Sequence, residues 1–172
     1  MSNFKKALDK VLKNEGGYVN DADDAGGETY KGVARNLWPK WEGWQIIDST
    51  PKYNLEFNQD LQSLVADFYR KNFWLEINAD IIKNDEVATS IFDFAVNAGA
   101  KTAVKLAQKV VDAVEDGELG VKTAEAINSM DPEKFLAGYQ LAKIARYVAI
   151  CKNKPSNRKF FFGWVCRTLE LN

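Results

Sequence analysis

The sequence contains no histidine, and this absence excludes several classes of catalytic site. A Ser-His-Asp triad and a Cys-His pair both need an imidazole base, so neither can operate in this chain. Metal sites built on imidazole are not expected either. Any catalytic chemistry must therefore use carboxylates, hydroxyls, amines or backbone dipoles.

Cysteine and long apolar runs are also scarce. The two cysteines, Cys151 and Cys166, lack a CxxC spacing, and we expect buried free thiols, with a structural disulfide as the alternative. No stretch approaches the roughly 18 apolar residues of a membrane span. The first residues lack the apolar run of a signal peptide. We therefore expect a protein made in the cytoplasm, without stable membrane insertion, that another protein delivers to any substrate outside the membrane.

The charge of the chain is unevenly distributed. Residues 1–97 carry 11 basic and 16 acidic side chains, whereas residues 98–172 carry 12 basic and 8 acidic ones. Such a distribution can steer a protein toward an anionic polymer, although an unevenly charged solvated surface explains it equally well. We expect no nucleic-acid partner.

The hydrophobic pattern predicts a mainly α (α+β) fold. Residues 3–14 form an amphipathic helix in which Phe4, Leu8 and Val11 recur at helical spacing, and the same face continues to Glu15. Loops with a short hairpin at 28–33 follow this helix. The rest of the chain is helical, with helices expected from 58, at 85–97, 101–115 and 121–129, from 132, and at 156–169. The predicted fold is a helical bundle with a small irregular or β element after the first helix.

Two carboxylates near the start of the chain are candidates for acid–base chemistry. The apolar helix face around Glu15 favours its neutral form, which can protonate a glycosidic oxygen. Asp24 lies in a polar, glycine-rich loop, where it stays ionised and can activate water or stabilise positive charge. The Thr29 hydroxyl can hold that water. Two carboxylates in contrasting environments are typical of glycoside cleavage.

Structural explanations of the same residues remain open. A glutamate at a helix end followed by glycines often only caps the helix, and Asp21 or Asp23 can cap turns. A calcium loop of the EF-hand type is excluded, because Ala25 and Gly32 stand where two ligands are required.

The segment from Glu15 to Gly32, called the front block below, resembles the signature of the glycoside hydrolase family 108 muramidases. The matching segments are Glu15–Tyr18, Asn20-Asp21 and Asp24–Gly32. In that family the motif glutamate is the catalytic acid, which the resemblance assigns to Glu15. As in phage-type lysozymes, Asp24 follows nine residues later, but Thr29 follows Asp24 by five residues rather than six.

The second half resembles the predicted peptidoglycan-binding region that follows the catalytic segment in these proteins. The matching segments are Ile91–Gly99, Leu106–Gln108, Asp116–Thr123 and Arg158–Arg167. The resemblance therefore implies a lysozyme-like catalytic segment at 1–90 and a helical binding region at 91–172, packed as one compact unit.

The implied reaction is hydrolysis of the β-1,4 bond between N-acetylmuramic acid and N-acetylglucosamine, without a cofactor or a metal. Substrate contacts are expected from Tyr18, Asn20, Tyr30 and Asn97, although a capping role is the alternative for Asn97. Tyr18, Tyr30 and three tryptophans offer rings that can stack on sugars or pack in the core. These tryptophans are Trp38, Trp41 and Trp44.

Two other functions remain open at this stage. A lytic transglycosylase would use one acid and form an anhydro product without water. A non-catalytic wall-binding or secretion-assisting module would bind sacculi without releasing fragments. The expected partners are the glycan strands of peptidoglycan, together with a holin in a prophage endolysin or a secretion machinery in a wall-remodelling helper.

Overall fold

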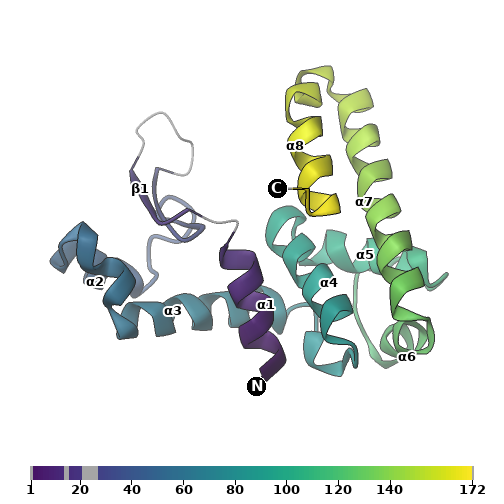
Figure 1. Ribbon diagram of the computed structural model, residues 1–172, viewed down its shortest axis with the longest axis horizontal. Helices are drawn as coiled ribbons and strands as arrows, with labels where there is room; N and C mark the ends of the chain where they lie inside the picture. The colour runs from purple at the N-terminus through teal and green to yellow at the C-terminus, as the bar shows by residue number, and fades with distance from the viewer. Residues whose placement is uncertain (1, 14–15, 21–26, 172) are drawn as a thin grey trace. The chain divides into compact units, whose positions relative to one another are not determined.

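The computed structural model describes residues 2–13, 16–20 and 27–171, and the chain divides into two compact units, Met1–Leu75 and Glu76–Asn172. Figure 1 shows a small sheet with short helices in the first unit and helices alone in the second. The described part of the chain is mainly helical with one three-stranded antiparallel sheet, which confirms the predicted fold class.

The first helix, α1 (Ser2–Leu12), confirms the predicted amphipathic segment. Its buried face consists of Ala7, Leu8 and Val11, which are at most 6% exposed. Burying a leucine or valine side chain contributes roughly 1.5–3 kcal/mol, so this face holds α1 against the rest of the unit. Phe4 adds an edge-on contact with the Trp74 ring at 5.4 Å.

The sheet follows α1 and contains β1 (Tyr18–Asn20), β2 (Glu28–Tyr30) and β3 (Val33–Ala34) in that order. Lys31 and Gly32 join β2 to β3, and both have positive φ angles, 43° and 80°. Two consecutive left-handed residues are the signature of a type I′ hairpin turn, in which glycine relieves the strain at the second position. The hairpin predicted at 28–33 is confirmed.

Four short helices complete the first unit: α2 (Gly43–Ser49), η1 (Lys52–Phe57), α3 (Gln59–Tyr69) and η2 (Arg70–Trp74). Asn58 caps α3, since its side chain accepts a hydrogen bond from the Leu61 backbone N–H at 2.9 Å. The Tyr69 hydroxyl at the end of α3 donates to the Lys31 carbonyl at 2.8 Å. This bond ties the hairpin turn to α3.

The second unit is built from helices with well-defined starts. Its elements are η3 (Ala79–Ile81), α4 (Asp85–Ala98), α5 (Ala100–Val110), α6 (Val121–Ser129), α7 (Pro132–Asn153), η4 (Pro155–Asn157) and α8 (Arg158–Leu169). Asn84 caps α4, and Asp131 caps α7 immediately before Pro132. Its core includes Phe94, Phe135 and Tyr139, each at most 1% exposed.

Helix α5 ends at Val110, so the predicted extent to residue 115 is wrong. The cause is the fully buried Gln108, which binds the loop that follows the helix. Its Oε1 accepts from the Gly117 N–H at 2.9 Å, and its Nε2 donates to Asp116 at 2.7 Å and to the Glu118 carbonyl at 3.1 Å. The loop thus satisfies its polar groups on a side chain instead of continuing the helical ladder.

The state of the cysteines and the apolar content of the helices were also predicted from the sequence. Cys151 is buried and Cys166 is partly buried, and both are free thiols, as expected. Among the residues with described positions, no helix is long and apolar enough to cross a membrane.

The Gln108 contacts generate a stability prediction. Gln108→Leu leaves the Gly117 N–H and the Glu118 carbonyl without their partner, so the free energy of unfolding should fall by about 2–3 kcal/mol. Urea denaturation monitored by circular dichroism measures the change. Gln45→Leu, on an exposed position of α2, is the matched control and should change little. Equal stability of both variants would contradict the role assigned to Gln108.

Candidate active site

The register of the sheet divides the predicted site residues between two faces. Tyr18 pairs with Tyr30, Asn20 with Glu28, and Val19 with Thr29. Paired residues project to the same face and successive residues to opposite faces. Tyr18, Asn20 and Tyr30 therefore share one face with Glu28, whereas Thr29 projects from the other.

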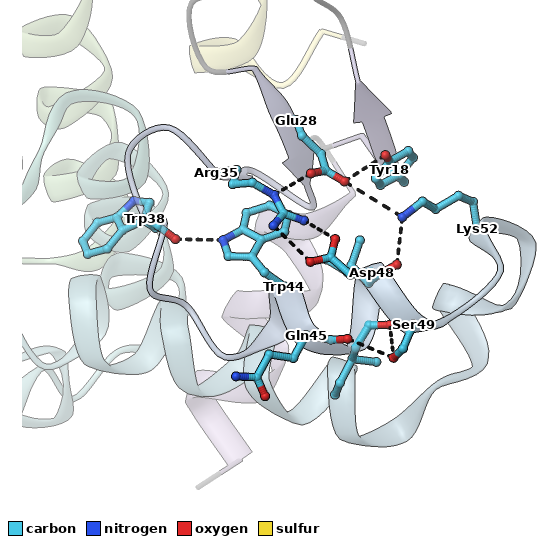
Figure 2. Close-up of polar contacts among 11 residues, drawn as sticks. Tyr18, Glu28, Arg35, Trp38, Trp44, Gln45, Asp48, Ser49 and Lys52 are labelled. Carbon is cyan, nitrogen blue, oxygen red and sulfur yellow. Dashed lines mark hydrogen bonds and ion pairs between the residues drawn. The ribbon is translucent and has the colours of Figure 1, made fainter.

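The centre of the first face is the carboxylate of Glu28, which sequence reasoning did not select. It is 16% exposed and pairs with Arg35 Nε at 2.5 Å and Lys52 Nζ at 3.9 Å. The Tyr18 hydroxyl donates to it at 2.8 Å. Figure 2 shows these groups converging on Glu28 from three segments of the first unit. Two cations and a phenol balance this carboxylate, which makes it an anchor for the hairpin.

Arg35 connects this carboxylate to α2. Its guanidinium forms a bidentate pair with Asp48, at 3.2 Å and 2.5 Å, and lies 4.3 Å from the centre of the Trp44 ring (Figure 2). Hydrogen bonding to Asp48 raises the pKa of Arg35, and the same bond lowers the pKa of the Asp48 carboxyl. A bidentate arginine fixes both distance and orientation, so the hairpin and α2 are held in one arrangement.

Tyr18 stands at the outer side of this network. Burial raises the pKa of its hydroxyl, and the hydrogen bond to Glu28 raises the pKa further. Lys52 lies 4.5 Å from the centre of its ring, in a cation–π contact. Tyr18 therefore stays a neutral donor with a fixed, partly exposed ring, which fits the predicted substrate contact.

Tyr30 has a different role from the predicted one. It is fully buried, and its hydroxyl donates to the Leu55 carbonyl at 3.3 Å and accepts from Gln62 at 2.9 Å. A ring without exposed surface cannot stack on a sugar. Tyr30 belongs to the core of the first unit, because it lies on the central strand and its hydroxyl reaches Leu55 of η1 and Gln62 of α3, whereas Tyr18 lies on the edge strand of the same face.

The remaining described candidates occupy separate places. The Thr29 hydroxyl donates to the Gly27 carbonyl at 3.2 Å, which leaves its lone pairs to accept a hydrogen bond from water. Asn20 is exposed at the end of β1. Asn97 belongs to the second unit, where its amide donates to the Asp93 carbonyl at 2.9 Å.

The two predicted catalytic carboxylates, Glu15 and Asp24, lie outside the described residues, as do Asp21 and Asp23. Along the chain, α1 ends shortly before Glu15, β1 ends before Asp21 and β2 begins after Asp24. The assignment of acid and base to these positions stays a prediction.

An aromatic pocket of about 380 Å³ opens elsewhere in the first unit, where its lining includes Trp38, Trp41 and Phe68. The Trp38 ring meets Phe68 edge-on at 4.9 Å. Trp38 is 39% exposed, so it is available to a ligand. Trp44 is only 3% exposed and donates to the Trp38 carbonyl at 2.8 Å, so the suggested sugar contact of Trp44 is replaced by a core role.

The residues that sequence reasoning missed are Glu28, Arg35, Asp48 and Lys52. Glu28 lies inside the motif that indicated the function, and this was the available signal. Nothing in the spacing of the others predicts their convergence, because the contacts join a strand, a turn and two helical segments. Within the part of the chain that the structure describes, no group of three or more cysteine, aspartate or glutamate side chains is arranged to hold a metal.

The sequence comparisons decide the family. Residues 8–99, more than half of the chain, match the family model described as glycosyl hydrolase 108. The chain belongs to the glycosyl hydrolase 108 family. Residues 102–169 match the model described as a predicted peptidoglycan domain.

Glycosyl hydrolase 108 proteins also include a solved structural relative of this chain. The structure of Brucella abortus SagA superposes with a TM-score of 0.70 at 27% sequence identity, covering 98% of this chain and 91% of that one. No curated protein matches the sequence significantly. Membership of the family makes this chain a glycoside hydrolase that acts on peptidoglycan, and the second region supports peptidoglycan as its partner.

The Asp48–Arg35 pair generates a prediction about stability and pH. The pKa of Asp48 is lowered below its ordinary 3.8 in the folded protein, so its contribution is present above that value and is lost as the pH falls through the folded pKa. Asp48→Asn should therefore lower Tm slightly at pH 7, and the difference should disappear in strong acid. Thermal unfolding at both pH values measures it.

Asp9→Asn, at an exposed position of α1, is the control for loss of a carboxylate. A deficit of Asp48→Asn that persisted unchanged in strong acid would contradict the ion-pair explanation.

Proposed function

We propose that this glycosyl hydrolase 108 protein is an N-acetylmuramidase that hydrolyses the β-1,4 bond between N-acetylmuramic acid and N-acetylglucosamine. The observation that carries the proposal is the family match over residues 8–99, which includes the whole block from Glu15 to Gly32. The fixed hairpin, which includes the end of this block, supports it, because functional residues are held best by rigid elements.

In the proposed mechanism Glu15 is the general acid. It protonates the glycosidic oxygen as the bond to the leaving sugar breaks. The apolar face of α1 supports this role indirectly: Leu8 and Val11, which precede Glu15 at helical spacing, are buried. A carboxylic acid that continues an apolar face is favoured in its neutral form.

Asp24 is the second carboxylate of the proposal. It either takes a proton from the attacking water or stabilises the positive charge that develops on the sugar ring. Thr29 would hold the water, since its hydroxyl donates to Gly27 and keeps its acceptor sites open. The strand register puts Tyr18 and Asn20 on the opposite face of the sheet from Thr29, so these two residues would contact a different part of the glycan from the bond that the Thr29-held water attacks.

The aromatic pocket is the second place where a sugar can bind in the first unit. Trp38 and Trp41 offer ring faces of the kind that cover the apolar side of a pyranose. We assign this pocket to glycan binding and not to catalysis.

Glu15→Gln tests the acid. Glutamine has nearly the same shape but cannot donate the proton, so the rate of clearing of purified sacculi should fall by about 100-fold or more while the fold is retained. Glu42→Gln, at an exposed position of the same unit, should clear at the wild-type rate. An unchanged rate for Glu15→Gln would assign the acid to another residue.

Mass spectrometry of the wild-type digest separates the two kinds of cleavage. Hydrolysis gives reducing muramic acid ends, whereas anhydro-muramic ends would identify a lytic transglycosylase. Sacculi that bind the protein without releasing fragments would identify a non-catalytic binding module.

Asp24→Asn tests the second carboxylate. Removal of its charge should lower the clearing rate roughly tenfold or more, because asparagine neither accepts the water proton nor stabilises the sugar cation. The conservative control is Asp9→Asn, which removes a carboxylate from an exposed position of α1. A near-normal rate for Asp24→Asn would move the second role to Asp21 or Asp23.

The cellular setting is also a proposal. Action at the cell wall agrees with the peptidoglycan-domain match. Release by a holin suits a prophage endolysin, and delivery by a secretion machinery suits a wall-remodelling helper.

A further inference from the structure

The second unit contains a pocket that the catalytic proposal does not use. It has a volume of about 170 Å³, and its lining residues come from α4, α7 and α8. Its lining includes Phe94, Asn97, Arg146, Tyr147, Trp164 and Arg167. Pockets for whole drug-sized ligands run to roughly 300–1,000 Å³, so this one fits the end of a ligand and not a whole sugar chain.

One wall of the pocket is aromatic. The Tyr147 and Trp164 rings lie 5.1 Å apart at an interplanar angle of 33°, and Phe94 meets Tyr147 at 6.3 Å. On its other side Trp164 stacks with Phe160 at 5.9 Å. The rings therefore support one another across α4, α7 and α8. They form a rigid surface against which methyl and methylene groups can pack.

Two arginines, Arg146 and Arg167, give the rest of the pocket lining a positive charge. Arg167 Nη2 pairs with Asp93 at 3.0 Å, which fixes its guanidinium at the pocket. Arg146 has no ion-pair partner among the residues whose positions are described, so its charge is not balanced by a protein carboxylate. No acidic residue occurs between Arg146 and Leu169. A positive charge therefore remains beside the aromatic wall.

Tyr147 and Asn97 add neutral polar groups. Burial raises the pKa of the Tyr147 hydroxyl, so it stays neutral and adds no negative charge to the pocket. Asn97 donates its amide N–H to its own helix, which leaves its carbonyl oxygen as an acceptor. The pocket thus offers a cation, an amide acceptor and an apolar wall within a small volume.

We propose that this pocket binds the carboxylate end of a short peptide, and that in the cell this ligand is the peptide stem of peptidoglycan. The cation recognises the carboxylate, because a guanidinium forms two parallel hydrogen bonds with it. The carbonyl of Asn97 accepts a peptide N–H, and the aromatic wall covers the adjoining alkyl side chain. A neutral glycan would need no guanidinium. The identity of the cellular ligand rests on the proposed function; the carboxylate chemistry does not.

The test uses a ligand without sugar, so that the glycan site of the first unit is not involved. An N-acetylated stem tetrapeptide with free carboxylates is titrated into the ¹⁵N-labelled full-length chain, and the Trp164 indole N–H is followed by NMR. Trp164→Phe assigns that signal. The expected result is saturable binding that shifts the Trp164 signal, while the same peptide with all its carboxylates amidated binds about tenfold more weakly or not at all.

Arg146→Gln tests the cation. It should weaken binding of the free-carboxylate peptide about tenfold and abolish the preference over the amidated peptide. Arg158→Gln is the matched control, since Arg158 is an exposed cation of α8 outside the pocket. Equal weakening by both variants would indicate a general charge effect and overturn the site, and so would unchanged binding by Arg146→Gln with an intact fold.

Clearing of sacculi separates this proposal from the catalytic one. Wild-type clearing that depends on Glu15, together with no shift of the Trp164 signal, would overturn the peptide site alone. Carboxylate-dependent peptide binding that Arg146→Gln removes, in a chain that clears no sacculi, would support the peptide site and overturn the muramidase.

Discussion

The contacts of Arg35 hold the small sheet and α2 of the first unit together. Its guanidinium binds Glu28 of β2 and Asp48 of α2 and rests on the Trp44 ring. Because the strands contain only two or three residues each, they bury too little surface to hold a position by themselves. The ion pairs of Arg35 with Glu28 and Asp48 supply the orientation that the small buried surface of the strands does not. The hairpin that includes the end of the predicted catalytic block is therefore oriented by Arg35, a residue outside the strands.

Gln108 plays a comparable part in the second unit. One fully buried amide binds three polar groups of the loop between α5 and α6. The segment Asp116–Thr123, which contributed to the family resemblance, thus has a structural role in this loop. The pocket between α4, α7 and α8, by contrast, combines aromatic and cationic groups that such architecture does not require.

The family and much of the secondary structure were predictable from local patterns. The apolar face of α1, the hairpin at 28–33, the Asn58 cap and the Asp131-Pro132 helix start all depend on residues within one turn or hairpin of each other. The family motif is likewise a continuous block. Such signals survive in the linear chain because the interactions behind them span only a few residues.

The sequence by itself determined that this protein works without an imidazole, that it is mainly helical, and that its front block carries the glycosyl hydrolase 108 motif. Only the tertiary structure decided which residues of that motif face outward. Tyr30 on the central strand is buried and Tyr18, its partner on the edge strand, stays partly exposed, although both are tyrosines of the same block. Likewise, only folding brings Glu28, Arg35 and Asp48 together, since ion pairs between separate elements leave no periodic trace in the sequence.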